Sequence, residues 1–253
     1  MGETSGFLEH GGERLAWRRI AGAGPTVVWL GGFNSDMTGT KAQALADWAQ
    51  ATGRAYLRFD YFGHGASSGS FREGTITRWR DDALSVLDHL VEGPVVLVGS
   101  SMGGWLACLA ALSRRARVKG LVLIAPAADF TERLIRPSLP EQARAAIAET
   151  GVWQRPSEYG DGDYAITRTL LEDGARWSIL PGPVAIKAPV RILQGGRDPD
   201  VPWTHALELA QAIESGDVVF TLIADGDHRL SRPQDIRRLI AAVEEVVITP
   251  ETP

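Results

Sequence analysis

The sequence predicts an α/β fold with a mostly parallel central sheet, helices on both faces and a helical cap insertion. Apolar runs typical of strands alternate with helical patterns along most of the 253 residues, and repeated β-α units of this kind form parallel sheets. The alternation stops once, at 126–189, where helical stretches near 140–150 and 164–174 occur without a buried strand. We therefore expect a single domain over residues 1–253, with 126–189 as a cap over one edge of the sheet.

The strands are predicted from short apolar runs, and the helices from apolar residues spaced three and four apart. A hairpin comes first, because the turn-forming letters HGG separate the first two runs. The later run VVLV contains no polar residue, which is typical of a strand covered on both faces. In chain order, the predicted strands lie at 7–9, 13–20, 26–30, 55–59, 95–98, 118–125, 190–194 and 218–223, and the helices at 38–51, 76–91, 105–112, 205–213 and 233–247.

Composition and charge argue against several classes of protein. The net charge of -5 at pH 7 gives no electrostatic reason to expect nucleic acid as a partner. No apolar stretch is long enough to span a membrane, and the first residues resemble neither a signal peptide nor a transit peptide, so we expect a cytoplasmic protein. The single cysteine, Cys108, is expected to be a small core residue. No spacing of histidine, cysteine and aspartate predicts a metal, and we expect no cofactor.

A candidate nucleophile lies where the strand VVLV meets the next helix. The letters GSSMG at 99–103 fit G-x-S-x-G, a tight turn that holds a serine in a strained conformation with its Oγ exposed. Only Ser101 fits the central position, because a turn centred on Ser100 would place Val98 and Met102 where the turn needs hydrogens. The alternative is an ordinary turn serine, since glycine and serine are common in turns.

A serine hydroxyl needs a base and an orienting carboxylate to act as a nucleophile at neutral pH. Asp198 follows the end of one predicted strand in the letters GGRDPD, and His228 follows the next in the letters ADGDHR. The chain order Ser101, Asp198, His228 is the one that accompanies this elbow. Asp200 is the alternative acid, although its place in the turn before Val201 favours Asp198. Turn, surface or packing roles are expected for His10, His64, His89, His205, Asp225 and Asp227.

Two backbone N–H groups and three tryptophans complete the predicted site. The N–H of Met102 at the helix start and that of Phe33 after the letters LGG are expected to bind the oxyanion. Trp105 beside the nucleophile, with Trp153 and Trp177 in the insertion, are expected to line an apolar acyl pocket. Most apolar residues of the insertion are expected only to pack it against the core.

Longer stretches resemble one group of the α/β-hydrolase superfamily. They run from about Val27 to about Val247 and are GGFNSDMTGTKA, LRFDYFGHGASSG, TRWRDDALSVLDHL, GPVVLVGSSMGGWLACLAA, GVWQRPSEY, APVRILQGG, RDPDVPW and DHR. The group includes the palmitoyl-protein thioesterase that is also described as mycophenolic acid acyl-glucuronide esterase. The resemblance implies the α/β-hydrolase fold and a triad of Ser101, Asp198 and His228. Animal members are mitochondrial and carry a transit peptide, which this sequence lacks, so we do not carry that location over.

We therefore expect a serine hydrolase that cleaves acyl thioesters or small carboxylic esters through an acyl-enzyme. Its partner would be a small-molecule ester or acyl thioester, or an acylated protein. The same fold and triad also serve peptidases and carbon–carbon hydrolases, and non-catalytic ligand receptors can retain the triad, so these stay as alternatives. The sequence predicts no oligomeric state.

Overall fold

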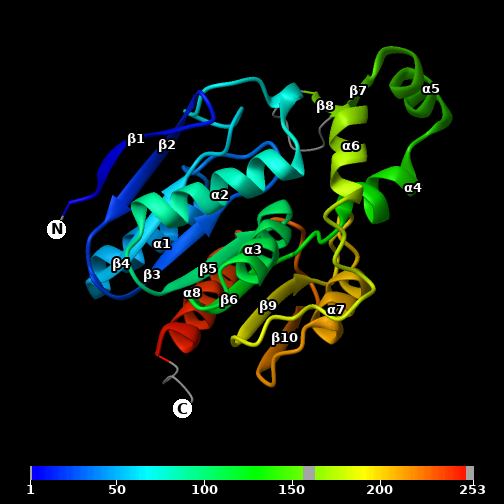
Figure 1. Cartoon of the computed structure of the whole chain (residues 1–253). Coiled ribbons are helices and arrows are strands. Elements are labelled where there is room, and N and C mark those ends of the chain that lie inside the picture. Colours follow the sequence, from blue (N-terminus) through cyan, green and yellow to red (C-terminus); the bar gives the residue numbers. More distant parts are fainter. Residues whose placement is uncertain (1, 156–162, 249–253) are drawn as a thin grey trace.

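The structure, a computed structural model, describes residues 2–155 and 163–248. Its centre is a sheet of eight strands, which are β1 (Thr4–His10), β2 (Glu13–Ile20), β3 (Ala23–Leu30), β4 (Arg54–Phe59), β5 (Val95–Ser100), β6 (Val118–Ile124), β9 (Val190–Gly195) and β10 (Val218–Ile223). Their order across the sheet is β1-β2-β4-β3-β5-β6-β9-β10 (Figure 1). The pairs β1-β2 and β2-β4 are antiparallel and all later pairs are parallel. The predicted α/β fold is therefore confirmed.

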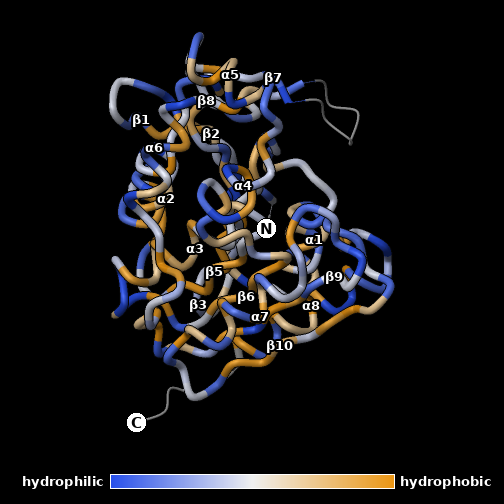
Figure 2. The backbone as a smooth tube through the Cα atoms, turned by 90° about the vertical axis from the view of Figure 1, so that its right-hand side faces the viewer, coloured by the Kyte–Doolittle hydropathy of each residue, from blue (hydrophilic) through white to orange (hydrophobic). Residues whose placement is uncertain are grey.

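Helices cover both faces of this sheet. They are α1 (Thr40–Thr52), α2 (Ile76–Leu90), α3 (Met102–Ser113), α7 (Trp203–Ala212) and α8 (Pro233–Ile248). Along β5, Val95 and Leu97 join one core with α2, α3 and α7, while Val96 and Val98 join a second core with α1 and α8. The unbroken apolar run is thus a strand buried on both faces, and Figure 2 shows hydrophobic segments along the central strands. No helix in the described ranges has both the length and the apolar composition needed to cross a membrane.

The segment between β6 and β9 holds short helices and a separate hairpin, which stand together at the upper right of Figure 1. Its elements are a π-helical turn (Thr131–Ile135), α4 (Arg136–Ser138), α5 (Glu141–Thr150), β7 (Val152–Arg155), β8 (Tyr164–Thr167) and α6 (Arg168–Ala175). The prediction of no buried strand is wrong here, because β8 pairs antiparallel with β7 and buries Ala165 and Ile166.

The helix predicted at 164–174 correspondingly begins four residues later, at Arg168. Thr167 ends the strand and caps the helix, its hydroxyl accepting a hydrogen bond from the N–H of Leu170 at 3.1 Å. The letters YAIT of β8 do not alternate apolar with polar residues, so they show no two-residue period. From the sequence alone, the short strand therefore cannot be distinguished from the helix that follows it.

Two buried aspartates fasten this segment to itself and to the body of the protein. Asp129, just after β6, accepts backbone hydrogen bonds from residues 179–180 at 2.8 to 3.1 Å, which joins the two ends of the segment. Asp173 on α6 accepts hydrogen bonds from both the N–H and the hydroxyl of Thr77 at 2.7 Å. Trp177 donates its indole N–H to the same hydroxyl at 2.7 Å. The first turn of α2 is therefore a polar anchor of the segment.

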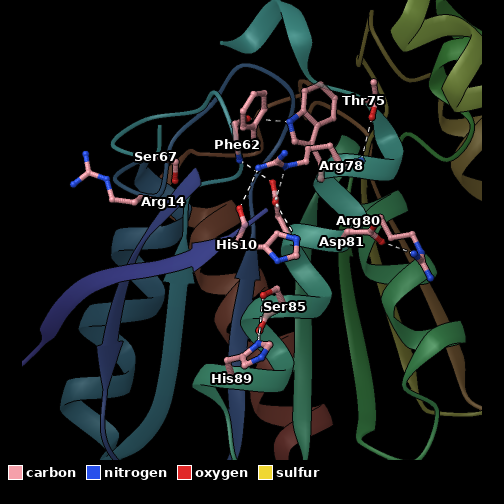
Figure 3. A network of polar contacts seen from close by, with 12 residues as sticks. His10, Arg14, Phe62, Ser67, Thr75, Arg78, Arg80, Asp81, Ser85 and His89 are labelled. Atoms are coloured by element: carbon pink, nitrogen blue, oxygen red, sulfur yellow. Dashed lines mark hydrogen bonds and ion pairs between the residues drawn. The ribbon is translucent and has the colours of Figure 1, made fainter. Parts of the chain in front are cut away.

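The next residue of α2, Arg78, joins the first hairpin to the loop after β4 (Figure 3). Its guanidinium lies 4.3 Å from the centre of the Phe62 ring and donates to the carbonyl of His10 at 3.3 Å. Asp82, fully buried, accepts from Arg78 at 3.3 Å and from the N–H of Phe62 at 2.9 Å. Burial raises the pKa of Asp82 to about 6. The network holds the loop that carries Phe62 beside the aromatic residues described below.

We expect Asp173→Ala to destabilise the protein, because it leaves two donors of Thr77 without their acceptor. Breaking such a buried pair costs about 2 to 4 kcal/mol, which lowers the Tm of a chain of this size by about 5 to 15 °C. Thermal melting checks this, with Glu172→Ala, an exposed neighbour on α6, as the matched control. Equal Tm values for the two variants would contradict the anchoring role.

Candidate active site

The turn between β5 and α3 forces Ser101 into a strained backbone conformation. Ser101 has φ 54° and ψ -119°, a region that residues with a side chain rarely adopt. A Cβ atom at Gly99 would lie 2.3 Å from the carbonyl oxygen of Gly103, and one at Gly103 would lie 2.1 Å from that of Leu30. Neither position accepts a side chain. The register that selects Ser101 over Ser100 therefore agrees with the packing of this turn.

The structure brings the predicted serine, histidine and aspartate together from three loops. Nε2 of His228 lies 3.1 Å from Oγ of Ser101, and Nδ1 of His228 lies 2.8 Å from Oδ2 of Asp198. The Asp198 side chain is fully buried, whereas 16% of the His228 side chain is exposed. The imidazole therefore faces the solvent-accessible serine on one side and a buried carboxylate on the other.

The carboxylate that contacts His228 belongs to Asp198 and is held by four hydrogen bonds. Its Oδ1 accepts from the N–H groups of Asp200 and Val201, each at 2.9 Å. Its Oδ2 accepts from His228 and from Nε2 of Gln194 at 3.2 Å. Asp200 thus supplies its backbone to the acid loop, as expected for the turn residue. The side chain of Asp200 lies 3.9 Å from the guanidinium of Arg155 on β7.

Asp198, Asp200 and His228 also form a compact group of possible metal ligands. One ligand atom from each lies within 4.8 Å of the other two. A metal would need a free imidazole nitrogen, but Nδ1 of His228 contacts Asp198 and Nε2 contacts Ser101. These contacts use both nitrogens, so the group fits a proton-transfer site better than a metal site.

The loop after β3 lies directly against the serine. A Cβ atom at Gly32 would be 3.3 Å from the carbonyl oxygen of Ser100 and 3.4 Å from Cβ of Ser101. The next residue along this loop is Phe33, and Met102 is the first residue of α3. An N–H in the first turn of a helix has no carbonyl partner within that helix. Both predicted oxyanion donors therefore lie in segments adjacent to Ser101.

The Phe33 side chain is the centre of an aromatic cluster beside this loop. Its ring lies 4.8 Å from that of Phe71, centre to centre, and 5.7 Å from that of Trp79. The rings of Phe130 and Tyr164, both from the segment between β6 and β9, each lie 5.6 Å away. We call these five residues the Phe33 cluster. It joins the loop after β3 to the segment between β6 and β9 through apolar contacts.

The three tryptophans predicted to line a pocket occupy different environments. Trp105 is fully buried, its ring lies 5.7 Å from that of Phe130, and its indole N–H has no hydrogen-bond partner among the described residues. Trp153 on β7 is partly buried against the core. Trp177 is engaged by Thr77 and by Arg80, whose guanidinium lies 4.4 Å from the indole centre. The contacts of Trp177 are those of an anchor to α2.

The remaining candidates occupy positions typical of structural residues. His64 packs between aromatic rings, and burial lowers its pKa to about 4. Burial raises the pKa of the Cys108 thiol to about 12, as expected for a core cysteine. Asp227 accepts from the N–H of Leu230 at 2.9 Å, and Asp225 pairs with an arginine in the same loop. His205 contacts a backbone oxygen at 2.7 Å.

Sequence reasoning missed two polar side chains that support the acid and histidine loops. Gln194 contacts Asp198, as described above. Lys41 on α1 donates a short hydrogen bond to the carbonyl oxygen of Arg229, the residue after His228. Burial lowers the pKa of Lys41 to about 8. A single glutamine at the end of β9, a strand whose other polar side chain is Arg191, was the only signal available for the first of them.

Comparisons with known proteins extend these findings. The model of the alpha/beta hydrolase family matches residues 10–241. Palmitoyl-protein thioesterase ABHD10, mitochondrial, from Bos taurus is 38% identical over 234 residues, covering 92% of this chain and 76% of that protein. The crystal structure of a protein from Agrobacterium vitis S4, named as a hydrolase, matches with a TM-score of 0.92 and 47% identity. The match covers 97% of this chain and 98% of that one. Alpha/beta hydrolase domain-containing protein 10 from mouse has a TM-score of 0.89 and 37% identity, covering 96% and 98%.

The names of the relatives contradict the predicted location. The proteins from cattle, rat, mouse and human that match over 92% of this chain are all named as mitochondrial. The cytoplasmic location expected from the sequence is therefore wrong. That expectation depended only on the pattern of the first residues of the sequence, which is no evidence for a compartment.

The fold, the sequence motifs and the relatives all indicate the same family over most of the chain. The family model extends from the first hairpin to α8 and includes the strained turn at Ser101 and the loops of Asp198 and His228. The two solved structures match nearly the whole length of the chain at 37% and 47% identity. The chain belongs to the alpha/beta hydrolase family.

Proposed function

We propose that this protein is a serine hydrolase that cleaves acyl thioesters or small carboxylic esters. The observation that carries the proposal is the pair of contacts made by His228, 3.1 Å to Oγ of Ser101 and 2.8 Å to the carboxylate of Asp198. A base between a hydroxyl and a buried carboxylate is the arrangement that activates a serine. The relatives named palmitoyl-protein thioesterase support a thioester among the substrates.

In the proposed reaction, His228 accepts the hydroxyl proton of Ser101 through Nε2 while Oγ attacks the acyl carbonyl carbon. The backbone N–H groups of Phe33 and Met102 bind the oxyanion that forms. Collapse of the tetrahedral intermediate breaks the bond to the thiol or alcohol, which leaves with the proton from His228. Water then attacks the acyl-enzyme with His228 as base, and the acid is released as Ser101 regains its proton. Asp198 orients the imidazole throughout.

We further propose that residues 126–189 act as a cap and that the Phe33 cluster forms one wall of an acyl site. Phe130 and Tyr164 of this segment contact the Phe33 ring, whose backbone N–H is assigned to the oxyanion. An acyl carbonyl held by that N–H lies next to apolar rings. The cluster contains no charged side chain, which favours an apolar acyl group over a charged one. Trp105, Trp153 and Trp177 stay as predicted lining residues, although the indole of Trp177 is already held by Thr77 and Arg80.

Ser101→Ala is expected to abolish hydrolysis of a short-chain thioester, lowering kcat at least about 10⁴-fold, because the nucleophile is lost. Labelling by a fluorophosphonate probe should be lost with it. Ser100→Ala is the matched control and should keep activity within about tenfold, because the hydroxyl that His228 contacts is that of Ser101. An inactive Ser100→Ala protein beside an active Ser101→Ala protein would show that the register is misassigned.

Asp198→Asn is expected to lower kcat about 10³- to 10⁴-fold while the protein stays folded, because an amide cannot orient His228 in the required tautomer. Asp200→Asn should cost less than about tenfold, since this residue serves the acid loop through its backbone N–H. Steady-state kinetics and thermal melting of both variants check the assignment. Similar losses in kcat would mean that the two carboxylates share the role.

Lengthening the acyl chain from about two to about eight carbons should raise kcat/KM by up to about fourfold per methylene until the site is full, because each buried methylene contributes about 0.8 kcal/mol. A carboxylate at the chain end should lower kcat/KM steeply. A series of thioesters with one common thiol measures this. A profile that is flat with length would argue against an apolar acyl site and leave the assignment of Ser101 untouched.

A further inference from the structure

Gln194 is a buried polar residue near the site, at the end of β9. This strand is otherwise built to be buried, and the side chain of Gln194 is itself completely inaccessible to solvent. Burying a primary amide without hydrogen bonds costs about 1 to 3 kcal/mol in proteins. An apolar residue would fill the same space without that cost. The position therefore calls for an explanation based on its polar contacts.

The amide nitrogen of Gln194 lies among three oxygen atoms. Nε2 is 3.0 Å from the carbonyl oxygen of Val201, 3.1 Å from that of Gly195 and 3.2 Å from Oδ2 of Asp198. Oε1 is buried and has no hydrogen-bond partner among the described residues. Rotating the amide by 180° would turn Oε1 toward three acceptors, which repel it. The surroundings thus select the orientation in which the amide only donates.

One of those acceptors is the oxygen atom that contacts the proposed base. Oδ2 of Asp198 accepts from Nδ1 of His228 at 2.8 Å and from Gln194 at 3.2 Å. Without the amide N–H groups, Oδ2 would face the carbonyl oxygens of Gly195 and Val201 with nothing between them. Repulsion would then favour a rotated carboxylate, and the bond to His228 would lengthen or bend.

We propose that Gln194 is a positioning residue for hydrolysis, because it holds the Asp198 oxygen that orients His228. The inference rests on the proposed serine hydrolase function. Gln194 touches no reacting atom. Its effect passes through the carboxylate to the imidazole, so its loss changes the rate of the chemical steps and leaves the acyl site as it is.

Gln194→Met is the first test, because methionine has a similar volume and no N–H. We expect kcat on a hexanoyl thioester to fall about tenfold, the size of one hydrogen bond to a charged group, with KM within about twofold. Gln194→Glu is the second test, since a carboxyl group donates a hydrogen bond only while it is protonated. Burial beside Asp198 raises the pKa of the introduced carboxyl, so that at low pH it replaces the amide as a donor.

The pH dependence of the Gln194→Glu variant separates positioning from packing. We expect its kcat/KM, divided by that of the wild type at the same pH, to fall at least about tenfold between about pH 6 and about pH 9, as the introduced carboxyl ionises and repels Asp198. For Gln194→Met the same ratio should be low and independent of pH. Gln211→Glu, exposed on α7, is the matched control and should keep a ratio near one at every pH.

A Gln194→Met enzyme with kcat within twofold of the wild type, or a Gln194→Glu ratio that stays constant with pH, would overturn the positioning role. If Gln194→Met loses its cooperative melting transition and is therefore unfolded, the pH dependence of the Gln194→Glu ratio alone tests the positioning role. The Ser101→Ala protein is assayed in parallel. Wild-type hydrolysis that persists in Ser101→Ala would refute the proposed function, and the role of Gln194 with it. Hydrolysis that depends on Ser101 together with a constant ratio would refute only the role of Gln194.

Discussion

The site depends on one steric constraint, the contact of the backbone of α3 with the ends of β3 and β5. Gly103 lies so close to the carbonyl oxygen of Leu30 that no side chain fits between them, and Gly99 is equally confined by Gly103. This approach leaves no room for a relaxed turn, and Ser101 adopts φ 54° as a result. The loop with Gly32 and Phe33 is pressed against the serine by the same contact. The proposed nucleophile and the proposed oxyanion donors are therefore positioned together.

The second requirement is that buried polar groups near the sheet edge find partners. Asp198 is fully buried and would be strongly destabilising without its four hydrogen bonds. Two of these come from backbone N–H groups of its own turn, one from Gln194 and one from His228. Because the imidazole is part of that set, the carboxylate and the imidazole stabilise each other's position. A preorganised arrangement of this kind needs little rearrangement as charge develops on the base.

Much of the fold could be predicted from the sequence, because most of its strands are short apolar runs bounded by turn residues and its helices show clear periodicity. The serine, histidine and aspartate could be predicted because each follows a strand end in a recognisable turn. The β7-β8 hairpin could not, since neither VWQR nor YAIT alternates apolar with polar residues, and the pairing of the two strands is not visible in either alone. Gln194 was missed for a related reason: a glutamine acquires its role only when three oxygens from other residues surround its amide.

Phe33 links the two halves of the proposed mechanism. Its backbone is assigned to the oxyanion, and its ring contacts Phe130 and Tyr164 of the insertion. An aromatic ring in a closely packed cluster is difficult to move without moving its own Cα. The position of the insertion and the position of the oxyanion donor are therefore coupled through one residue. In the proposed enzyme, an acyl group that packs against these rings would also fix the position of the N–H that binds its carbonyl oxygen. Apolar contacts with the acyl group would therefore raise the rate of the chemical step as well as the affinity for substrate.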